Sequence, residues 1–251
     1  MRRISNSSTW RAILLAWGLS LISLPSALIA GPTVSPSPVA QADEPFGLPT
    51  AAVTTGTLLQ KWRDVEREVD GERAVLRVCK ENRASCRSQA ALQFLAIVDS
   101  ARALQGRARL GQINRAINLK IKAMSDVALY GAEDVWSPPL ATLAIGAGDC
   151  EDYAIAKFVA LQEVGVSADD LRIVVLRDDM RQEDHAVVAA RLDGSWLMLD
   201  NRHMLMVEDR QVQADHPEFV IDHDDVKRYT YAPTTPEPSP GYERSIGELL
   251  H

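Results

Sequence analysis

Positive charge is scarce in this chain of 251 residues, which carries 27 Lys and Arg against 34 Asp and Glu and has a formal net charge of -7. An acidic surface repels the phosphates of nucleic acids and anionic lipids, and no stretch combines basic residues with interleaved aromatics. We therefore do not expect nucleic acid as a partner, whereas a protein substrate or a calcium ion fits the charge. With 46% hydrophobic and 24% charged residues, the composition is that of a soluble globular protein with about one domain of ordinary size.

A long uncharged hydrophobic run occurs at the N-terminus. Three arginines precede or border an apolar stretch at residues 12–30, which is the pattern of an export signal. The small-x-small pattern that ends at Ala42 predicts cleavage after that residue, so residues 1–42 are interpreted as a signal peptide. An uncleaved anchor is the alternative, because the apolar stretch is nearly long enough to cross a bilayer.

Cysteine is also rare, and its number, three, is odd. Oxidising compartments pair thiols and leave the odd one as a candidate reactive group. Cys79 and Cys86 are seven residues apart and could form a disulfide, which would leave Cys150 free. Alternatively, all three cysteines are reduced and buried as small hydrophobic side chains.

Proline and hydrophobic spacing divide the first half of the chain. Proline-rich residues 43–56 predict an extended linker without a fold. Apolar residues then recur at spacings of three and four in the three segments 57–70, 88–104 and 110–130, which predicts three helices. Asp70-Gly71 is expected to end the first of these helices.

The second half is predicted to combine one helix with an antiparallel sheet. A helix is expected over residues 150–164, with Asp149 as its N-cap and Gly165 as its stop signal. The three segments 171–177, 185–192 and 195–199 have the composition of strands. Residues 57–232 thus form the predicted domain, followed by a Pro-rich tail at 233–251.

Cys150 is the candidate nucleophile, because it stands in the first turn of the predicted helix. The positive end of a helix dipole and its free N–H groups stabilise a thiolate, and the same N–H groups can bind an oxyanion during acyl transfer. A cysteine at this position can also be structural and inert.

A predicted hairpin brings a histidine and an aspartate together. If Asp193-Gly194 is a two-residue turn, residues whose numbers sum to 387 face one another, and His185 and Asp200 become diagonal neighbours within side-chain reach. Asp200 would then orient His185, which would accept the thiol proton of Cys150 and later protonate the leaving group. A three-residue loop would shift this register by one, and singly the two residues could be a strand-end histidine and a turn former.

Three segments carry a resemblance to a known family. They are Asp149-Cys150-Glu151-Asp152-Tyr153-Ala154, His185-Ala186-Val187 and Leu199-Asp200-Asn201. The chain resembles the bacterial transglutaminase-like cysteine proteases, in particular the periplasmic LapG type. Further positions that match the family pattern are Trp62, Asn114, Asn118, Asp134, Trp136 and Pro138. Arg202-His203 departs from the pattern, where an apolar residue is expected.

The resemblance implies an α+β fold with a papain/transglutaminase-like core, in which N-terminal helices and a Cys-bearing helix pack on an antiparallel sheet that carries His and Asp. It also implies a calcium-dependent periplasmic endopeptidase with Cys150, His185 and Asp200 as its triad. The implied substrate is the N-terminal region of a large surface adhesin, whose cleavage releases cells from a biofilm. The implied partner is an inner-membrane cyclic di-GMP receptor of LapD type, and Trp136 is a candidate contact if it is exposed.

Acidic residues crowd around the candidate nucleophile. Asp149, Glu151 and Asp152 raise the pKa of Cys150, and a bound calcium ion would offset them, because carboxylate oxygens are its preferred ligands. The resemblance implies Asp149 and Glu151 as ligands, with Asp152 as a further candidate. Helix capping and solvated acids are the alternative. A zinc site formed by Cys150, His185 and His203 is a weaker hypothesis, because closely spaced Cys and His pairs are lacking.

Three functions remain open from the residues alone. The chain could be an endopeptidase, a transglutaminase-type acyl transferase, or a catalytically silent binding module on the same fold. The first two share a thioester intermediate and differ in whether water or an amine resolves it. The resemblance favours hydrolysis.

Overall fold

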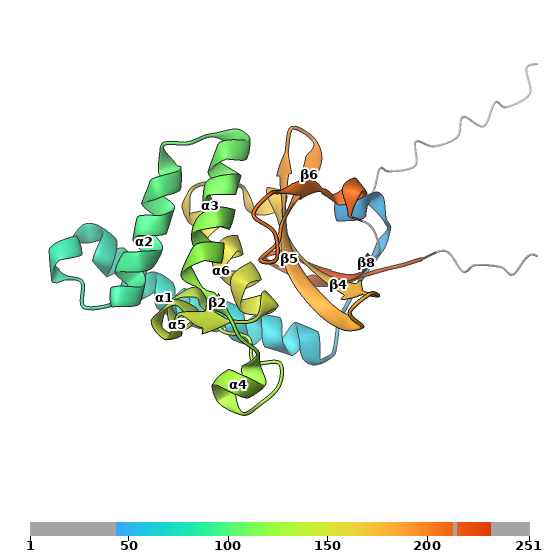
Figure 1. The fold of residues 1–251 in the computed structure, drawn as a ribbon, viewed down its shortest axis with the longest axis horizontal. Helices are drawn as coiled ribbons and strands as arrows, with labels where there is room; N and C mark the ends of the chain where they lie inside the picture. The colour runs from blue at the N-terminus through green and yellow to red at the C-terminus, as the bar shows by residue number, and fades with distance from the viewer. Residues whose placement is uncertain (1–43, 213–214, 232–251) are drawn as a thin grey trace, which may run out of the picture. The chain divides into compact units, whose positions relative to one another are not determined.

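The computed structural model describes residues 44–212 and 215–231. The predicted signal peptide at 1–42 and the Pro-rich tail at 233–251 lie outside these residues. In the part of the chain that is described, no helix is long and apolar enough to cross a membrane. The fold is α+β, with helices packed against an antiparallel sheet (Figure 1).

Most of the helices precede the sheet strands in the chain. They are α1 (Thr57–Glu81), α2 (Gln89–Arg102), α3 (Gly106–Lys120), α4 (Asp126–Tyr130), α5 (Pro139–Ile145) and α6 (Cys150–Glu163). Figure 1 shows α6 between the other helices and the sheet. Its ten buried positions run from Asp152 to Leu161 without interruption, as expected for a helix covered on all sides.

The sheet has seven strands in the order β1-β9-β8-β4-β5-β6-β7, and every neighbouring pair is antiparallel. The strands are β1 (Thr50–Ala52), β4 (Leu171–Asp178), β5 (Glu183–Leu192), β6 (Ser195–Leu199), β7 (Val207–Glu208), β8 (Asp215–Ile221) and β9 (Val226–Tyr229). A separate parallel pair joins β2 (Lys122–Ala123) to β3 (Ala147–Gly148).

The register of the β5–β6 hairpin is confirmed. Leu192 pairs with Ser195, and the ladder continues to Val188 opposite Leu199. Asp193 and Gly194 both have positive φ, 52° and 83°, which is the backbone that a two-residue hairpin turn of this type requires.

The two faces of the sheet pack into separate hydrophobic clusters. Strand β5 alternates between them: Ala186, Val188 and Ala190 face the helices, whereas Val187 and Ala189 face the other side. The helix-side cluster is the larger core and contains residues of α1, α2, α3, α5 and α6. Alternation of this kind is the signature of a sheet that is covered on both faces.

Helix α1 is longer than the sequence predicts, because it continues through Asp70-Gly71 to Glu81. Glycine in a helix costs about 1 kcal/mol. The apolar stripe continues beyond it with Leu76 and Cys79, which are each 2% exposed, and their burial outweighs the cost of the glycine.

Two other expectations are corrected by the structure. The predicted helix at 110–130 is interrupted, because β2 separates α3 from α4. Residues 43–56, predicted as a linker, contribute β1, which pairs with β9. Glu44 anchors this segment: it is 8% exposed and contacts Arg172 Nε at 2.6 Å and Lys227 Nζ at 2.8 Å. A paired carboxylate of this kind tolerates burial.

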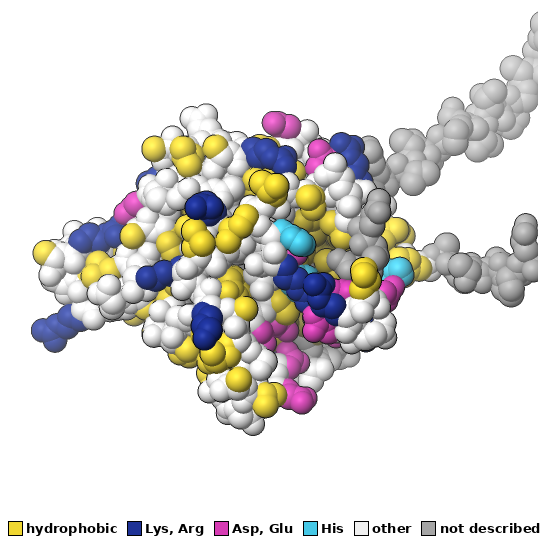
Figure 2. Space-filling view, viewed as in Figure 1, with side chains coloured by type: hydrophobic (Ala, Val, Ile, Leu, Met, Phe, Trp, Pro, Cys, Tyr) yellow, Lys and Arg dark blue, Asp and Glu magenta, His cyan; other side chains and the backbone are white. Residues whose placement is uncertain are grey.

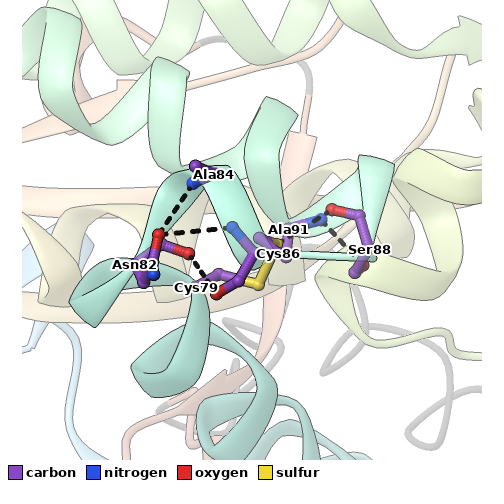
Figure 3. The surroundings of a disulfide bond; sticks show 7 residues. Cys79, Asn82, Ala84, Cys86, Ser88 and Ala91 are labelled. Carbon is purple, nitrogen blue, oxygen red and sulfur yellow. Dashed lines mark hydrogen bonds between the residues drawn. A yellow bond between two sulfur atoms is a disulfide. The ribbon is translucent and has the colours of Figure 1, made fainter.

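Cys79 and Cys86 form a disulfide at the end of α1, and Cys150 is free. Figure 3 shows the loop that the disulfide closes. Within it, the Asn82 side chain accepts hydrogen bonds from the backbone N–H groups of Ala84 and Ser85 at 3.1 and 3.2 Å. The sequence left this pairing open, and the structure settles it in favour of one bond and one free thiol.

Candidate active site

Cys150 is the first residue of α6, as predicted, and Asp149 is the N-cap residue without a side-chain capping bond. The thiol is partly buried. Its sulfur donates a hydrogen bond to Glu151 Oε2 at 2.9 Å, and the backbone N–H of Ala186 in β5 donates to the sulfur. The nucleophile candidate is therefore held between the start of a buried helix and the middle of the sheet.

The predicted histidine and aspartate are in contact. His185 Nε2 is 2.9 Å from Asp200 Oδ1, and His185 is 2% exposed. Burial is the largest single influence and opposes ionisation of Asp200, but the hydrogen bond with His185, the charge of His185 and the hydrogen bond from the Arg202 backbone together outweigh it and lower the pKa of the carboxyl. The other ring nitrogen, Nδ1, is buried and has no partner among residues 44–212 and 215–231.

The imidazole belongs to the residue next to the amide that binds the thiol. His185 immediately precedes Ala186, whose N–H contacts the Cys150 sulfur. A thiol, an imidazole with one nitrogen that lacks a partner in the described parts of the chain, and a carboxylate that orients the imidazole are the groups used in thiol acyl transfer.

Arg202 and His203, which depart from the family pattern, have defined places. The Arg202 guanidinium contacts Asp178 Oδ2 at 2.9 Å and Glu183 Oε1 at 2.6 Å, and its backbone N–H donates to Asp200 Oδ1 at 2.9 Å. His203 has a side chain that is 71% exposed, with Nε2 3.8 Å from Asp200 Oδ2. Arg202 thus supports the Asp200 carboxylate from the backbone side.

Three acids converge next to the thiol. Ligand atoms of Asp126, Asp149 and Asp152 lie within 4.8 Å of one another. Each of these residues has one buried carboxylate oxygen that finds no hydrogen-bond donor in the described parts of the chain. Buried carboxylate oxygens without partners are costly, and such a donor set suits a hard cation such as calcium.

The composition of this acidic cluster differs in part from the prediction. Asp149 and Asp152 belong to it, and Asp126 was not predicted. The Glu151 carboxylate is at the Cys150 sulfur instead.

Two features of the backbone build the cluster. The parallel pair of β2 and β3 sets Ala123 opposite Gly148, which brings Asp126 to the start of α6. A Cβ at Gly148 would lie 2.7 Å from Asp152 Cβ, closer than real Cβ contacts, so glycine is needed where Asp152 turns back toward the cluster.

Burial and mutual repulsion make negative charge costly here. Burial, then the charge of Glu151, raises the pKa of Asp149 to about 9, and burial followed by the nearby Asp126 charge raises the pKa of Asp152 to about 7. Burial and Glu151 also raise the pKa of the Cys150 thiol. A cation in the cluster would reverse this balance.

The thiol opens onto a cavity of about 530 Å³ between β2, the start of α6 and the start of β5. Five of its eleven lining residues are acidic, and Arg202 is the basic one; the acids are Asp134, Asp149, Glu151, Glu183 and Asp184. Figure 2 shows Asp and Glu side chains gathered between β2 and the sheet, next to a group of Lys and Arg side chains. Trp136 is half-buried and packs against the core, and its Nε1 donates to Asp134 Oδ1 at 2.9 Å.

A helix-borne cysteine packed on an antiparallel sheet that carries a His–Asp pair defines the class of transglutaminase-like cysteine proteases. Residues 72–224 match the bacterial transglutaminase-like cysteine proteinase family (BTLCP), and the chain belongs to this family. The match includes all three residues of the predicted triad. No curated protein sequence matches the chain.

Solved structures of LapG from Legionella pneumophila are similar to this chain. One is 21% identical, with a TM-score of 0.51 over 62% of this chain and 86% of LapG. The calcium-bound form is 21% identical, with a TM-score of 0.52 over 64% of this chain and 91% of LapG. An EGTA-treated form matches with 21% identity and a TM-score of 0.51 over 62% of this chain and 84% of LapG. These likenesses show a shared fold.

Proposed function

We propose that the chain is a cysteine endopeptidase in which Cys150 is the nucleophile, His185 the general base and Asp200 the residue that orients His185. The observation that carries this proposal is the His185–Asp200 contact of 2.9 Å. His185 Nδ1 has no partner among the described residues, and His185 is next to the residue whose amide binds the Cys150 sulfur.

The chemistry follows from these positions. His185 accepts the thiol proton as sulfur attacks the scissile carbonyl, and backbone N–H groups at the start of α6 stabilise the oxyanion. His185 then protonates the leaving amine, which departs and leaves a thioester on Cys150. Water, deprotonated by His185, hydrolyses the thioester and restores the thiol.

We include calcium in the proposal, held by Asp126, Asp149 and Asp152, with Glu151 as a further candidate ligand. The three partnerless carboxylate oxygens support it, and calcium-bound and EGTA-treated forms of LapG exist among the similar structures. Bound calcium would supply positive charge beside the thiol, which favours the thiolate.

The substrate and the setting are proposed from the family resemblance. We propose an exported, periplasmic enzyme that cleaves the N-terminal region of a large surface adhesin and so promotes release from a biofilm. A cyclic di-GMP receptor of LapD type in the inner membrane would control it. The excess of acidic over basic residues in the cavity at Cys150 supports a substrate segment without clustered acids.

The test is cleavage of a recombinant N-terminal adhesin fragment from the same organism by the purified chain. Wild type in calcium should cut the fragment, whereas Cys150→Ala and wild type in EGTA should not. Adding dansylcadaverine distinguishes hydrolysis from transfer, because a transferase would attach the amine to protein. Uncut fragment with wild type in calcium would refute the protease, and equal cleavage in EGTA would refute the calcium requirement.

A further inference from the structure

Lys157 is a charged residue inside the main core. It lies on α6 and is 1% exposed. Lysine is almost never buried completely unless its ammonium is paired, and methionine of similar shape would fill the same space without losing hydration. Burial lowers the pKa of Lys157 to about 7, so the fold accepts a cost at this position. The contacts of the ammonium indicate why a lysine occupies this position.

The Lys157 ammonium binds the end of the strand that precedes Asp200. Its Nζ donates to the carbonyl of Leu199 at 3.2 Å, and Leu199 is the last residue of β6. The nearby charge of Asp200 favours the ammonium form. On its own helix, Lys157 Nζ is 5.8 Å from the centroid of the Tyr153 ring, a weak cation–π contact.

Asn118 holds the next carbonyl from a second helix. This α3 side chain donates from Nδ2 to the carbonyl of Asp200 at 2.9 Å and to the carbonyl of His203 at 3.2 Å. Lys157 and Asn118 therefore donate hydrogen bonds to the carbonyls of two consecutive residues, at the point where the β5–β6 ladder ends. Each contact fixes the backbone and leaves the Asp200 carboxylate free to bind His185.

Helix geometry links this contact to the nucleophile. Lys157 follows Cys150 by seven residues, which is about two turns, so both side chains leave the same side of α6. At the start of α6 the Cys150 thiol contacts β5, and two turns later the Lys157 ammonium contacts the end of β6. The position of α6 therefore sets the thiol and the acid relative to each other.

We propose that Lys157 and Asn118 are positioning residues, which hold the end of β6 so that Asp200 meets His185 in line with Cys150. This inference rests on the proposed protease function. Neither side chain touches the reacting atoms. Their effect reaches the reaction through the place of the Asp200 carboxylate, and a displacement of about 1 Å can lower a rate about a hundred-fold.

The test compares Lys157→Met and Asn118→Ala with Tyr229→Phe as the matched control. Tyr229 is also buried, at 3% exposure, but lies in the cluster on the opposite face of the sheet, and its hydroxyl has no partner among the described residues. For each purified variant, kcat and KM on the adhesin fragment, the rate of Cys150 alkylation by iodoacetamide and Tm are measured in calcium.

We expect Lys157→Met to keep a Tm equal to or above that of wild type, because it removes a buried charge. Its kcat should fall about ten- to a hundred-fold, with KM within about two-fold and slower alkylation of Cys150. Asn118→Ala should show the same selective loss of kcat, and Tyr229→Phe should keep the wild-type kcat, KM, alkylation rate and Tm.

Wild-type kcat and alkylation rates in both Lys157→Met and Asn118→Ala would overturn the inference, as would a loss that follows Tm or KM. If Lys157→Met does not fold, Asn118→Ala decides. A wild type that cuts nothing refutes the proposed function instead, and the alkylation rates then still test the positioning of His185 and Asp200.

Discussion

Asp126→Asn tests the acidic cluster most directly, because Asp126 enters it from a segment far from Cys150 in the sequence. Asparagine has the same shape and keeps an oxygen that accepts the hydrogen bond from the backbone N–H of Val135, as Asp126 Oδ2 does. The substitution therefore removes one negative charge and leaves the local backbone contact in place. Without calcium the substitution should not lower stability, whereas the stabilisation that calcium provides should become smaller.

The magnitude follows from the separation of the ligand atoms, which lie within 4.8 Å of one another. At an effective dielectric constant of about 20, two full charges at this distance repel by about 3 to 4 kcal/mol, an upper limit because a buried carboxyl can stay protonated. Without calcium, Asp126→Asn should thus be as stable as wild type or more stable.

With calcium at about a hundred times its Kd, wild type should gain about 2.7 kcal/mol, or about 5 to 11 °C in Tm for a domain of this size. Loss of one carboxylate should weaken calcium binding at least about ten-fold, which is 1.4 kcal/mol. The calcium-induced rise in Tm of Asp126→Asn should therefore be smaller by at least about 3 °C.

The assay is thermal unfolding of both proteins in EGTA and across a calcium titration, with calorimetry for the Kd. Asp134→Asn is the control, because Asp134 lines the same cavity but has an exposed side chain paired with Lys61. It should keep the wild-type calcium shift. An Asp126→Asn variant with an undiminished calcium shift would refute the assignment of Asp126 to a metal site.

Three further predictions concern the rest of the fold. Gly148→Ala should abolish the calcium-induced rise in Tm, because the added Cβ would displace Asp152; an unchanged rise would contradict the close approach. Burial raises the pKa of Glu72 from 4.5 to about 7, so the folded state retains a proton that the unfolded state loses. As the pH rises from 4.5 to 7, the contribution of Glu72 to the free energy of unfolding should therefore fall, by at most about 3 kcal/mol. Urea unfolding of Glu72→Gln should show a free energy of unfolding that depends less on pH in this range. Replacing both Cys79 and Cys86 by alanine should cost about 2 to 3 kcal/mol, seen as a lower urea midpoint with wild-type kcat.

The hairpin and the nucleophile helix could be predicted because their signals are local. Asp193-Gly194 specifies a two-residue turn, and the turn sets the register in which Val188–Leu192 of β5 pairs with β6. That register was enough to bring His185 and Asp200 together. In the same way, Asp149 and the apolar run after it marked the start of α6.

Asp126 could not be predicted, because its place depends on a parallel pair of two-residue strands. Strands this short have no hydrophobic alternation to detect, and the apolar spacing around them favoured one continuous helix.

Lys157 was missed for another reason. The sequence shows a lysine in an apolar helix, but its burial depends on packing of α6 against both β5 and α3, which periodicity alone does not reveal.

The structure also changes the argument for the reactivity of Cys150. A helix N-terminus typically stabilises an anion by about 0.3 to 1 kcal/mol, which is less than one pKa unit. Burial and the adjacent Glu151 oppose the thiolate by more than that, because together they raise the pKa of the thiol well above its usual value. The helix start is therefore insufficient by itself. A positive charge close to the sulfur would offset this effect, and a calcium ion at Asp149 and its neighbours would supply one. Such an effect would give a physical reason for the proposed nucleophile and the acidic cluster to share one short motif at the start of α6.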